Sequence, residues 1–167
     1  MWLARMQGAL KVCAIVLCLS ALMPQTAFGD AKPSAGLLAP IYTFVSAAAS
    51  ANSKLLSAVC TSDVTIVDEF PPYEWSGPDA VRRYAAGVEA DYQKDKVRDI
   101  HVAIEDPRYF DVKGNWAWAS VPATFSYLFA GKRTSESGVF AFVLVKSDDA
   151  WRIKSSSWAI TSFATER

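Results

Sequence analysis

Three strand-like runs of apolar and aromatic residues occupy the last third of the chain. Residues 115–129, 134–146 and 151–161 are rich in the β-branched and aromatic side chains that are typical of strands. Short turn sequences at residues 130–133 and 147–150 separate these runs. Strands joined by such short turns pair antiparallel. The pattern therefore predicts a three-stranded antiparallel meander.

Apolar residues at helical spacing precede the meander by some 60 residues in two short segments. Pro40 is acceptable in a first helical turn, and Ile41, Phe44 and Val45 follow on one face, so we expect a first helix from Pro40. Asn52 is a typical N-cap for a second helix over residues 53–60.

The next segment alternates like a strand and then becomes helical. Residues 64–70 are rich in β-branched side chains, and their alternation places Asp68 on the same, more apolar face as Val64 and Ile66. Pro71 and Pro72 must end this strand. Ser76 or Asp79 is then expected to cap a helix that reaches about residue 96, with an apolar stripe formed by Ala80, Val81, Tyr84, Ala85, Val88 and Tyr92.

A further strand over residues 100–112, continuing past Pro107, leads through a turn at residues 113–115 into the meander. The order is helices, strand, helix and then antiparallel strands. This order predicts an α+β domain in which helices pack on the concave face of a curved antiparallel sheet.

The N-terminus has the features of a secretory signal peptide. Arg5 and Lys11 precede an apolar run at residues 12–23, and Ala27-Phe28-Gly29 resembles a cleavage site. A retained membrane anchor is the weaker alternative, because spanning a bilayer takes about 20 apolar residues. We therefore expect a signal peptide at 1–29, a flexible leader at 30–39 and one domain at 40–167. The mature protein is expected to be periplasmic or secreted, with no membrane association after the signal is removed.

Charge and cysteine content narrow the function classes. Removing Arg5 and Lys11 from the 17 basic residues leaves 15, against 17 acidic residues. This balance lacks the basic surface that phosphate binding needs, so we expect no nucleic-acid partner. The mature chain keeps only Cys60, which closes an apolar run and is expected to be a buried apolar residue rather than a nucleophile.

The chain also resembles a known superfamily over about residues 40–161. The pieces that carry the resemblance are residues 67–77 before the long helix, 121–125, Gly131-Lys132, 136–138 and 151–153. Their order and spacing are similar to those of the nuclear-transport-factor-2-like (NTF2-like) superfamily, in particular its SnoaL-like branch, which includes ketosteroid isomerase and scytalone dehydratase. The resemblance implies a cystatin-like, cone-shaped fold: a curved antiparallel sheet wrapped around N-terminal helices and one long helix, enclosing a mostly apolar pocket, often in a homodimer packed through the outer sheet face.

The resemblance also suggests one catalytic position. In the ketosteroid-isomerase branch an aspartate base precedes the Ser-Gly at the strand-to-helix junction by a fixed interval, and Asp68 lies at the similar distance from Ser76-Gly77. The isomerase also uses an acid on a late strand for its oxyanion hole. Residues 138–145 contain no acid, which argues against ketosteroid isomerisation itself.

Candidate site residues follow from these patterns. Asp68 is the candidate general base, because partial burial would raise its pKa toward neutrality. His101, the only histidine, and Tyr73 are weaker candidates for assisting Asp68 in proton transfer. The strand alternation places His101 on the other face from the aliphatic residues around it. The candidate ligand-binding residues are Tyr42, Trp75, Trp116, Trp118, Glu136 and Trp158.

The alternatives at several of these positions stay open. Asp68 could instead cap a turn or pair with an arginine, and the aromatic residues could be ordinary core. Trp116 and Trp118 share one parity, and Phe125, Tyr127 and Phe129 share the other; a bulge at Pro122 could reset that parity. The pattern does not say which set lines a pocket. A lone histidine without a Cys or His cluster gives no zinc site, and no cofactor motif is present.

Two functions are consistent with the sequence. The first is a cofactor-free exported domain that binds a small, largely apolar molecule and, if it is an enzyme, performs proton transfer of the isomerase, dehydratase or cyclase type. The second is a non-catalytic dimerisation or protein-interaction module of the cell envelope. Aromatic residues are abundant in pockets and in interfaces alike, so composition does not separate the two.

Overall fold

The structure is a computed structural model that describes residues 32–166. The predicted signal peptide lies outside the described residues. Within them the chain forms three helices, α1 (Ala35–Ala49), α2 (Ser53–Val59) and α3 (Ala80–Lys94). It also forms seven strands: β1 (Cys60–Val67), β2 (Glu74–Ser76), β3 (Arg98–Ile104), β4 (Tyr109–Lys113), β5 (Trp116–Phe129), β6 (Lys132–Ser147) and β7 (Ala150–Thr165). The α+β prediction is confirmed.

The helix starts differ in part from expectation. α1 begins at Ala35, so residues 35–39 are helical and the prediction that they belong to a flexible leader is wrong. Ser34 caps this end by accepting a hydrogen bond from the Leu37 N–H at 3.4 Å. Asn52 caps α2 as predicted, accepting from the Leu55 N–H at 3.1 Å. Asp79 occupies the N-cap position of α3 but makes no side-chain cap hydrogen bond there.

The sheet is built around the predicted meander. Its strand order is β2-β1-β7-β6-β5-β3, with β4 also paired to β5. β5, β6 and β7 pair antiparallel, whereas β1 joins β7 in parallel. The single strand predicted over residues 100–112 is instead two strands, β3 and β4, because β5 changes partner along its length.

Pro122 lies where β5 changes partner, between its pairing with β4 and its pairing with β3. Its carbonyl accepts a hydrogen bond from the Glu105 N–H at 3.0 Å. The pairing of β5 with β6 runs through Pro122 without a shift, so the suggested bulge is absent there. Odd-numbered residues therefore face the concave side along all of β5, and Trp116 and Trp118 face the outside.

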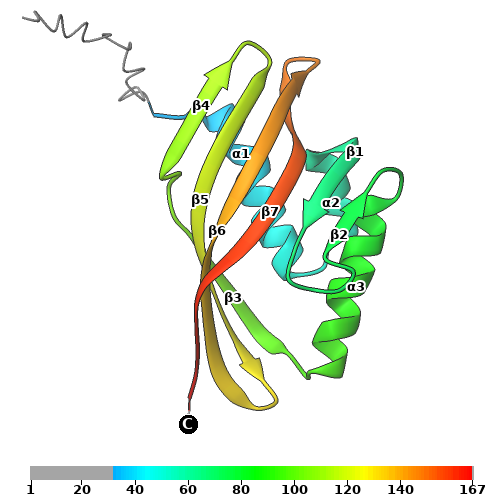
Figure 1. Cartoon of the computed structure of the whole chain (residues 1–167), viewed down its shortest axis with the longest axis vertical. Helices are drawn as coiled ribbons and strands as arrows, with labels where there is room; N and C mark the ends of the chain where they lie inside the picture. Colours follow the sequence, from blue (N-terminus) through cyan, green and yellow to red (C-terminus); the bar gives the residue numbers. More distant parts are fainter. Residues whose placement is uncertain (1–31, 167) are drawn as a thin grey trace, which may run out of the picture.

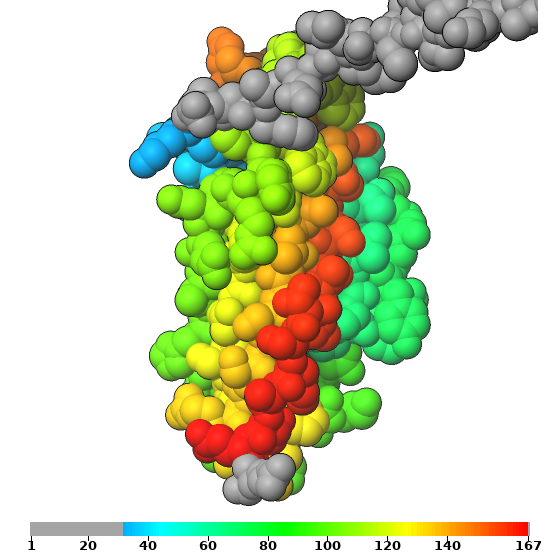
Figure 2. Space-filling model, turned by 60° about the vertical axis from the view of Figure 1, so that its left-hand side comes forward, coloured from blue at the N-terminus to red at the C-terminus, as the bar shows by residue number. Residues whose placement is uncertain are grey.

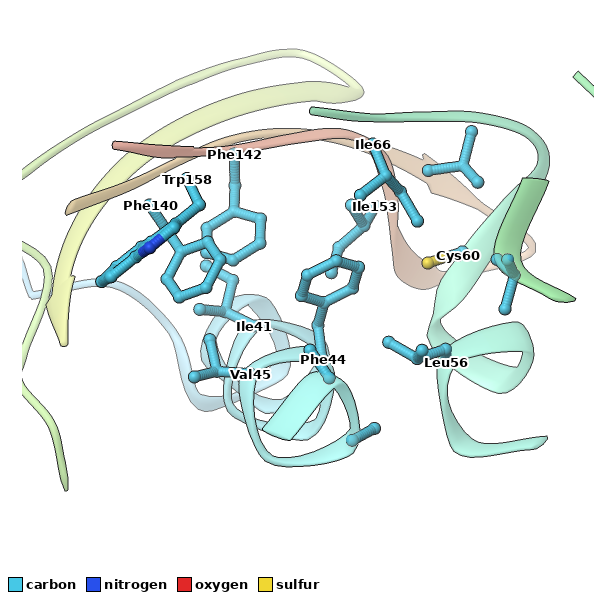
Figure 3. Packing of buried hydrophobic residues seen from close by; sticks show 14 of the residues in the cluster. Ile41, Phe44, Val45, Leu56, Cys60, Ile66, Phe140, Phe142, Ile153 and Trp158 are labelled. Atoms are coloured by element: carbon cyan, nitrogen blue, oxygen red, sulfur yellow. The ribbon is translucent and has the colours of Figure 1, made fainter. Parts of the chain in front are cut away.

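α1 packs against the concave face of the sheet and contributes six residues to the buried core (Figure 1). Figure 3 shows Ile41, Phe44 and Val45 of α1 directed at the aromatic residues of β6 and β7. The rings of Phe44 and Phe142 meet edge to face, with centroids 5.5 Å apart. Cys60 is buried beside this core, which confirms the expectation for that residue.

α1 is too short to cover the whole concave face. Its 15 residues span about 22 Å, whereas the 16 residues of β6 span about 50 Å. The helix ends at Ala49, and the sheet continues past it toward the β5–β6 turn, where β3 and the end of α3 close the sides (Figure 1). The cone therefore has one half filled by α1 and one half that α1 does not reach.

The outer face of the sheet carries exposed aromatic residues. Figure 2 shows β5, β6 and β7, yellow to red, lying side by side across this face. Trp116 is 52% exposed and Trp118 is 39% exposed on it.

No helix within residues 32–166 is long and apolar enough to cross a membrane.

Candidate functional site

A cavity of about 250 Å³ occupies the half of the cone that α1 leaves open. Helices, strands and the segments between them all contribute to its wall. The lining residues are Ala48 and Ala49 of α1; Asp68, Glu69 and Phe70 after β1; Tyr84, Asp91, Tyr92 and Asp95 of α3 and its C-cap; Val97 and Ile100 at the start of β3; and Phe125, Tyr127, Phe129, Glu136, Phe140, Trp158, Ile160 and Phe163 of the meander. Glu69, Phe129, Ile160 and Phe163 are exposed and form its mouth.

Asp68 is held in the cavity wall directly after β1. Its residue is only 8% exposed, because the alternation of β1 carries it to the same side as Val64 and Ile66. Oδ2 accepts a hydrogen bond from the Tyr84 hydroxyl at 2.7 Å, and Oδ1 accepts one from the Glu69 N–H at 2.7 Å. Burial raises the pKa of Asp68 from its ordinary 3.8 to about 6, although both hydrogen bonds oppose the rise.

Tyr84 links Asp68 to α3. The helix places its side chain inside the core, where the ring meets Trp75 edge to face at a centroid distance of 5.1 Å. Burial, followed by the negative charge of Asp68, raises the pKa of Tyr84 well above 10. The phenol therefore stays protonated near neutral pH and acts as a fixed donor to Asp68.

Glu136 is the second buried carboxyl group, with 5% of the residue exposed. Oε1 accepts a hydrogen bond from the Trp158 indole N–H at 2.8 Å, and Oε2 accepts one from the Tyr127 hydroxyl at 3.1 Å. Three neighbouring strands thus contribute to one arrangement, with Tyr127 on β5, Glu136 on β6 and Trp158 on β7. All the donors are neutral, so they orient Glu136 without compensating its charge.

Gly138 makes room for this arrangement. A Cβ atom on Gly138 would lie 2.6 Å from the ring of Trp158, closer than side chains tolerate. The pairing of β6 with β7 also shifts register between Ser137 and Gly138. Only glycine at this position leaves room for the indole against β6. The ring of Phe140 also packs against the indole, with centroids 4.4 Å apart (Figure 3).

Glu69 brings a third carboxyl group to the mouth of the cavity. The residue as a whole is exposed, but its side chain borders the cavity beside Glu136. Partial loss of solvent, followed by the charges of Glu136 and Asp68, raises the pKa of Glu69 to about 8. Two acids of adjacent sequence thus favour different protonation states near neutral pH.

All the charged side chains in the cavity wall are acidic. Asp91 and Asp95 add to the three acids above, and the described residues that line the cavity include no lysine, arginine or histidine. Within residues 32–166, no group of three or more Asp, Glu, His or Cys side chains is arranged to hold a metal ion. The acids are therefore set among aromatic faces rather than gathered as ligands around one point.

The predicted site residues separate into two groups. Asp68, Glu136 and Trp158 lie together in the cavity wall. Trp75 is buried behind Tyr84 rather than in the wall. Tyr42 lies on α1 outside the cavity and donates to Asp106 at 3.3 Å.

The other predicted residues lie at the surface. Trp116 and Trp118 are on the outer face of the sheet, so the expectation that they contact a ligand in the cone is wrong. Tyr73 is 59% exposed beyond the end of β1, and His101 is exposed on β3. Neither belongs to the cavity wall, so neither is placed to assist Asp68.

Several residues of the cavity wall were not predicted from the sequence. Tyr84 and Tyr92 were expected only as an apolar stripe of the helix, and Glu69 was expected to point away from Asp68. The strand ends at Val67; Asp68, directly after this end, still follows the alternation of β1, whereas Glu69, one residue further on, does not. The Pro71-Pro72 pair that follows was the available signal for this early end.

Comparison with known proteins agrees with the fold. A family model described as SnoaL-like domain matches residues 38–161. No curated protein matches the chain at a significant level.

Solved structures add neighbours of the same fold. The Kfla4162 protein from Kribbella flavida is 16% identical with a TM-score of 0.65, covering 78% of this chain and 91% of that one. Hexachlorocyclohexane dehydrochlorinase LinA-type3 from Novosphingobium barchaimii is 12% identical with a TM-score of 0.63, covering 77% and 89%. A ketosteroid isomerase-like protein from Erwinia carotovora atroseptica is 17% identical with a TM-score of 0.60, covering 77% and 95%. At such identities the likeness establishes the fold and not the chemistry.

Proposed function

The chain belongs to the SnoaL-like domain family, and from this membership and the cavity we propose that it binds a small, largely apolar molecule in the cone and transfers a proton on it, with Asp68 as the base. The observation that carries the proposal is the position of Asp68: a buried carboxyl group, held by two hydrogen bonds, in the wall of an otherwise largely aromatic and aliphatic cavity.

The environment of Asp68 suits a base. With a pKa of about 6, the group is mostly ionised at neutral pH yet binds a proton more readily than an ordinary aspartate. It would take a proton from a carbon of the bound molecule, and the electron pair left behind would shift into an adjacent electron-withdrawing group. Return of the proton at another carbon gives isomerisation, and departure of a leaving group gives elimination. Glu69, with a pKa of about 8, is mostly protonated at neutral pH and is the nearest candidate for the acid.

Native mass spectrometry of the protein purified from its source tests ligand binding. We expect a retained small molecule, and we expect Ala49→Leu, which adds volume inside the cavity, to lose it. Ala159→Leu is the matched control, because it makes the same change at an exposed position outside the cavity. Retention of the molecule by Ala49→Leu, or its loss from Ala159→Leu, would contradict binding in the cone.

Proton transfer is tested separately on the retained molecule. In D2O the wild-type protein should incorporate deuterium at one carbon of that molecule, and Asp68→Asn should bind the molecule without this exchange. Equal exchange by both proteins would remove Asp68 from the proposed role.

A second candidate function rests on the outer sheet face. Trp116 and Trp118 are two residues apart on β5, so both are exposed on this face. Such an exposed aromatic pair supports a homodimer or an envelope-protein contact through this face. Sedimentation of Trp116→Ser together with Trp118→Ser should then show a monomer where the parent protein is a dimer. A parent protein that is monomeric at high concentration would argue against the homodimer.

Export also belongs to the proposal. Arg5, Lys11 and the apolar run at residues 12–23 support removal of residues 1–29 and release to the periplasm or the medium. N-terminal sequencing of the protein from its source should begin at Asp30. A start at Met1 would contradict export by this route.

A further inference from the structure

We propose that the molecule bound in the cone is an organic cation, a protonated amine or quaternary ammonium group carried on an apolar body. The inference rests on the proposed function for the existence of a ligand and adds its chemical class. It follows from three properties of the cavity: all its charged side chains are acidic, aromatic side chains line it, and it leaves free volume.

The charge of the wall is not a reflection of the whole chain. The sequence has equal numbers of acidic and basic residues, 17 of each, yet every charged side chain in the cavity wall is acidic. The described salt bridges use other acids, namely Asp79 with Arg82, Asp149 with Lys146 and Asp63 with Lys154. The cavity carboxylates therefore lack a cationic partner among residues 32–166.

The absence of a cationic partner is unfavourable at Asp68 and Glu136, because both residues are more than nine-tenths buried. Their hydrogen bonds come from hydroxyl, indole and backbone donors, which are neutral. Buried charge is normally compensated by an opposite charge or by protonation. A cationic ligand would supply the missing charge at the place where the carboxyl groups already face open volume.

The aromatic residues point to the same class. Phe125, Tyr127, Phe140 and Trp158 line the wall beside Glu136. The face of an aromatic ring attracts an ammonium group, most strongly when the site is desolvated. Carboxylates combined with aromatic faces are thus favourable to a cation and unfavourable to an anion.

A bare metal ion fits less well. A hard cation needs several oxygen ligands around one point, and no such group exists within residues 32–166. A cavity of about 250 Å³ with an aliphatic and aromatic wall leaves space for an apolar body beside the charge. The chemistry therefore favours an organic cation.

Three probes of similar size and different charge test the inference. 2-Phenylethylamine is cationic at neutral pH, 2-phenylethanol is neutral and phenylacetate is anionic, and isothermal titration calorimetry gives the affinity of each. We expect the amine to bind at least about tenfold more tightly than the alcohol, and the acetate to bind most weakly.

Glu136→Gln should remove most of the preference for the amine over the alcohol. Asp63→Asn is the matched control: it makes the same acid-to-amide change on the surface, where Asp63 pairs with Lys154, and should leave the preference unchanged. If Glu136→Gln does not fold, Glu69→Gln at the exposed mouth provides the same test. A preference that survives in the folded cavity variants would overturn the inference.

Binding should also release protons. A cation beside Glu69, which faces Glu136 and Asp68, favours its ionised form. The binding enthalpy of the amine should therefore vary between buffers of different ionisation enthalpy at pH 7, corresponding to release of up to about one proton, while that of the alcohol should not. Proton uptake on binding of the amine would contradict the proposed contact.

The outcomes separate the two proposals. Equal affinity for the amine and the alcohol would overturn the cationic class and leave binding in the cone intact. Failure of all three probes to bind would contradict the cationic class, and absence of a retained molecule in native mass spectrometry would contradict the proposed function.

Discussion

The two halves of the cone use the same three strands but differ in what covers them. Over one half, α1 fills the concave face with side chains such as Phe44 and Ile41, which are fully buried against Phe142 and Leu144. Over the other half, the same strands carry Tyr127, Glu136 and Trp158, and a cavity replaces the helix. The comparison teaches that the sheet builds the shape, and the length of α1 decides where the chain keeps a space.

The open half holds groups that a core optimised for stability would not contain. Buried carboxyl groups without a cationic partner destabilise a fold, and apolar residues of similar volume are usually better there. Proteins retain such groups where function needs them, at a cost in stability. The filled half offsets that cost, so the two halves should respond differently to mutation and to pH.

Truncation should separate the halves most strongly. Phe44→Ala removes a ring that is fully enclosed between α1 and β6, and we expect a loss of about 3–5 kcal/mol in the free energy of unfolding. Phe129→Ala, at the exposed mouth of the cavity, should cost less than about 1 kcal/mol. Urea denaturation of both variants measures the contrast, and equal losses would contradict it.

The pH dependence of stability should come largely from the open half. The folded-state pKa of Asp68 is raised from 3.8 to about 6, so between these values the folded protein holds a proton that the unfolded chain releases. Its contribution to stability is therefore greatest below pH 4 and is lost as pH rises through 6, by up to about 3 kcal/mol.

Asp68→Asn should abolish this part of the pH dependence. Tyr84→Phe should move its upper end to higher pH, because it removes a hydrogen bond that favours the ionised form. Denaturation of the three proteins at several pH values between 3 and 8 makes the measurement. A parallel pH dependence in wild type and Asp68→Asn would rule out this source.

Gly138 should connect stability to the geometry of the open half. Gly138→Ala forces the ring of Trp158 away from β6, and we expect a loss of about 1–3 kcal/mol. The indole N–H signal of Trp158 should also shift in the NMR spectrum, because its hydrogen bond to Glu136 is disturbed. Gly87→Ala is the control, since a Cβ there makes an ordinary 3.5 Å contact with Trp75. An unchanged Trp158 signal in Gly138→Ala would contradict the role of Gly138.

The smallest effect is expected at His101. His101→Gln lies on an exposed strand position away from the cavity and should change stability by less than about 0.5 kcal/mol, with no change in probe binding. A tenfold loss of probe affinity would show that the site extends beyond the open half.

Alternation and spacing predicted much of the fold and part of the site. The meander, the antiparallel order and the burial of Asp68 follow from local patterns, because the side-chain direction in a strand is fixed by parity. Glu136 shares the parity of Phe140, and both are buried on the concave side of β6. Parity could not identify Tyr84 as a site residue. Its hydrogen bond to Asp68 depends on how α3 packs against β1, which local patterns do not determine.

The positions of helix and strand ends limited the rest. α1 starts before Pro40, and β1 stops at Val67, next to Asp68, Glu69 and Phe70 of the cavity wall. β7 continues beyond the predicted 161, which brings Phe163 to the cavity mouth. Such ends depend on tertiary contacts as well as on local sequence.

The protonation of Asp68 is the most direct test of the proposal that the open half holds a desolvated base. A 13C NMR titration of the aspartate carboxyl carbons, with the Asp68 signal assigned by its absence in Asp68→Asn, measures it directly. Burial in the open half predicts a midpoint of about 6 for Asp68. A midpoint near the ordinary ~3.9 of an aspartate in water would contradict a desolvated base in this cavity.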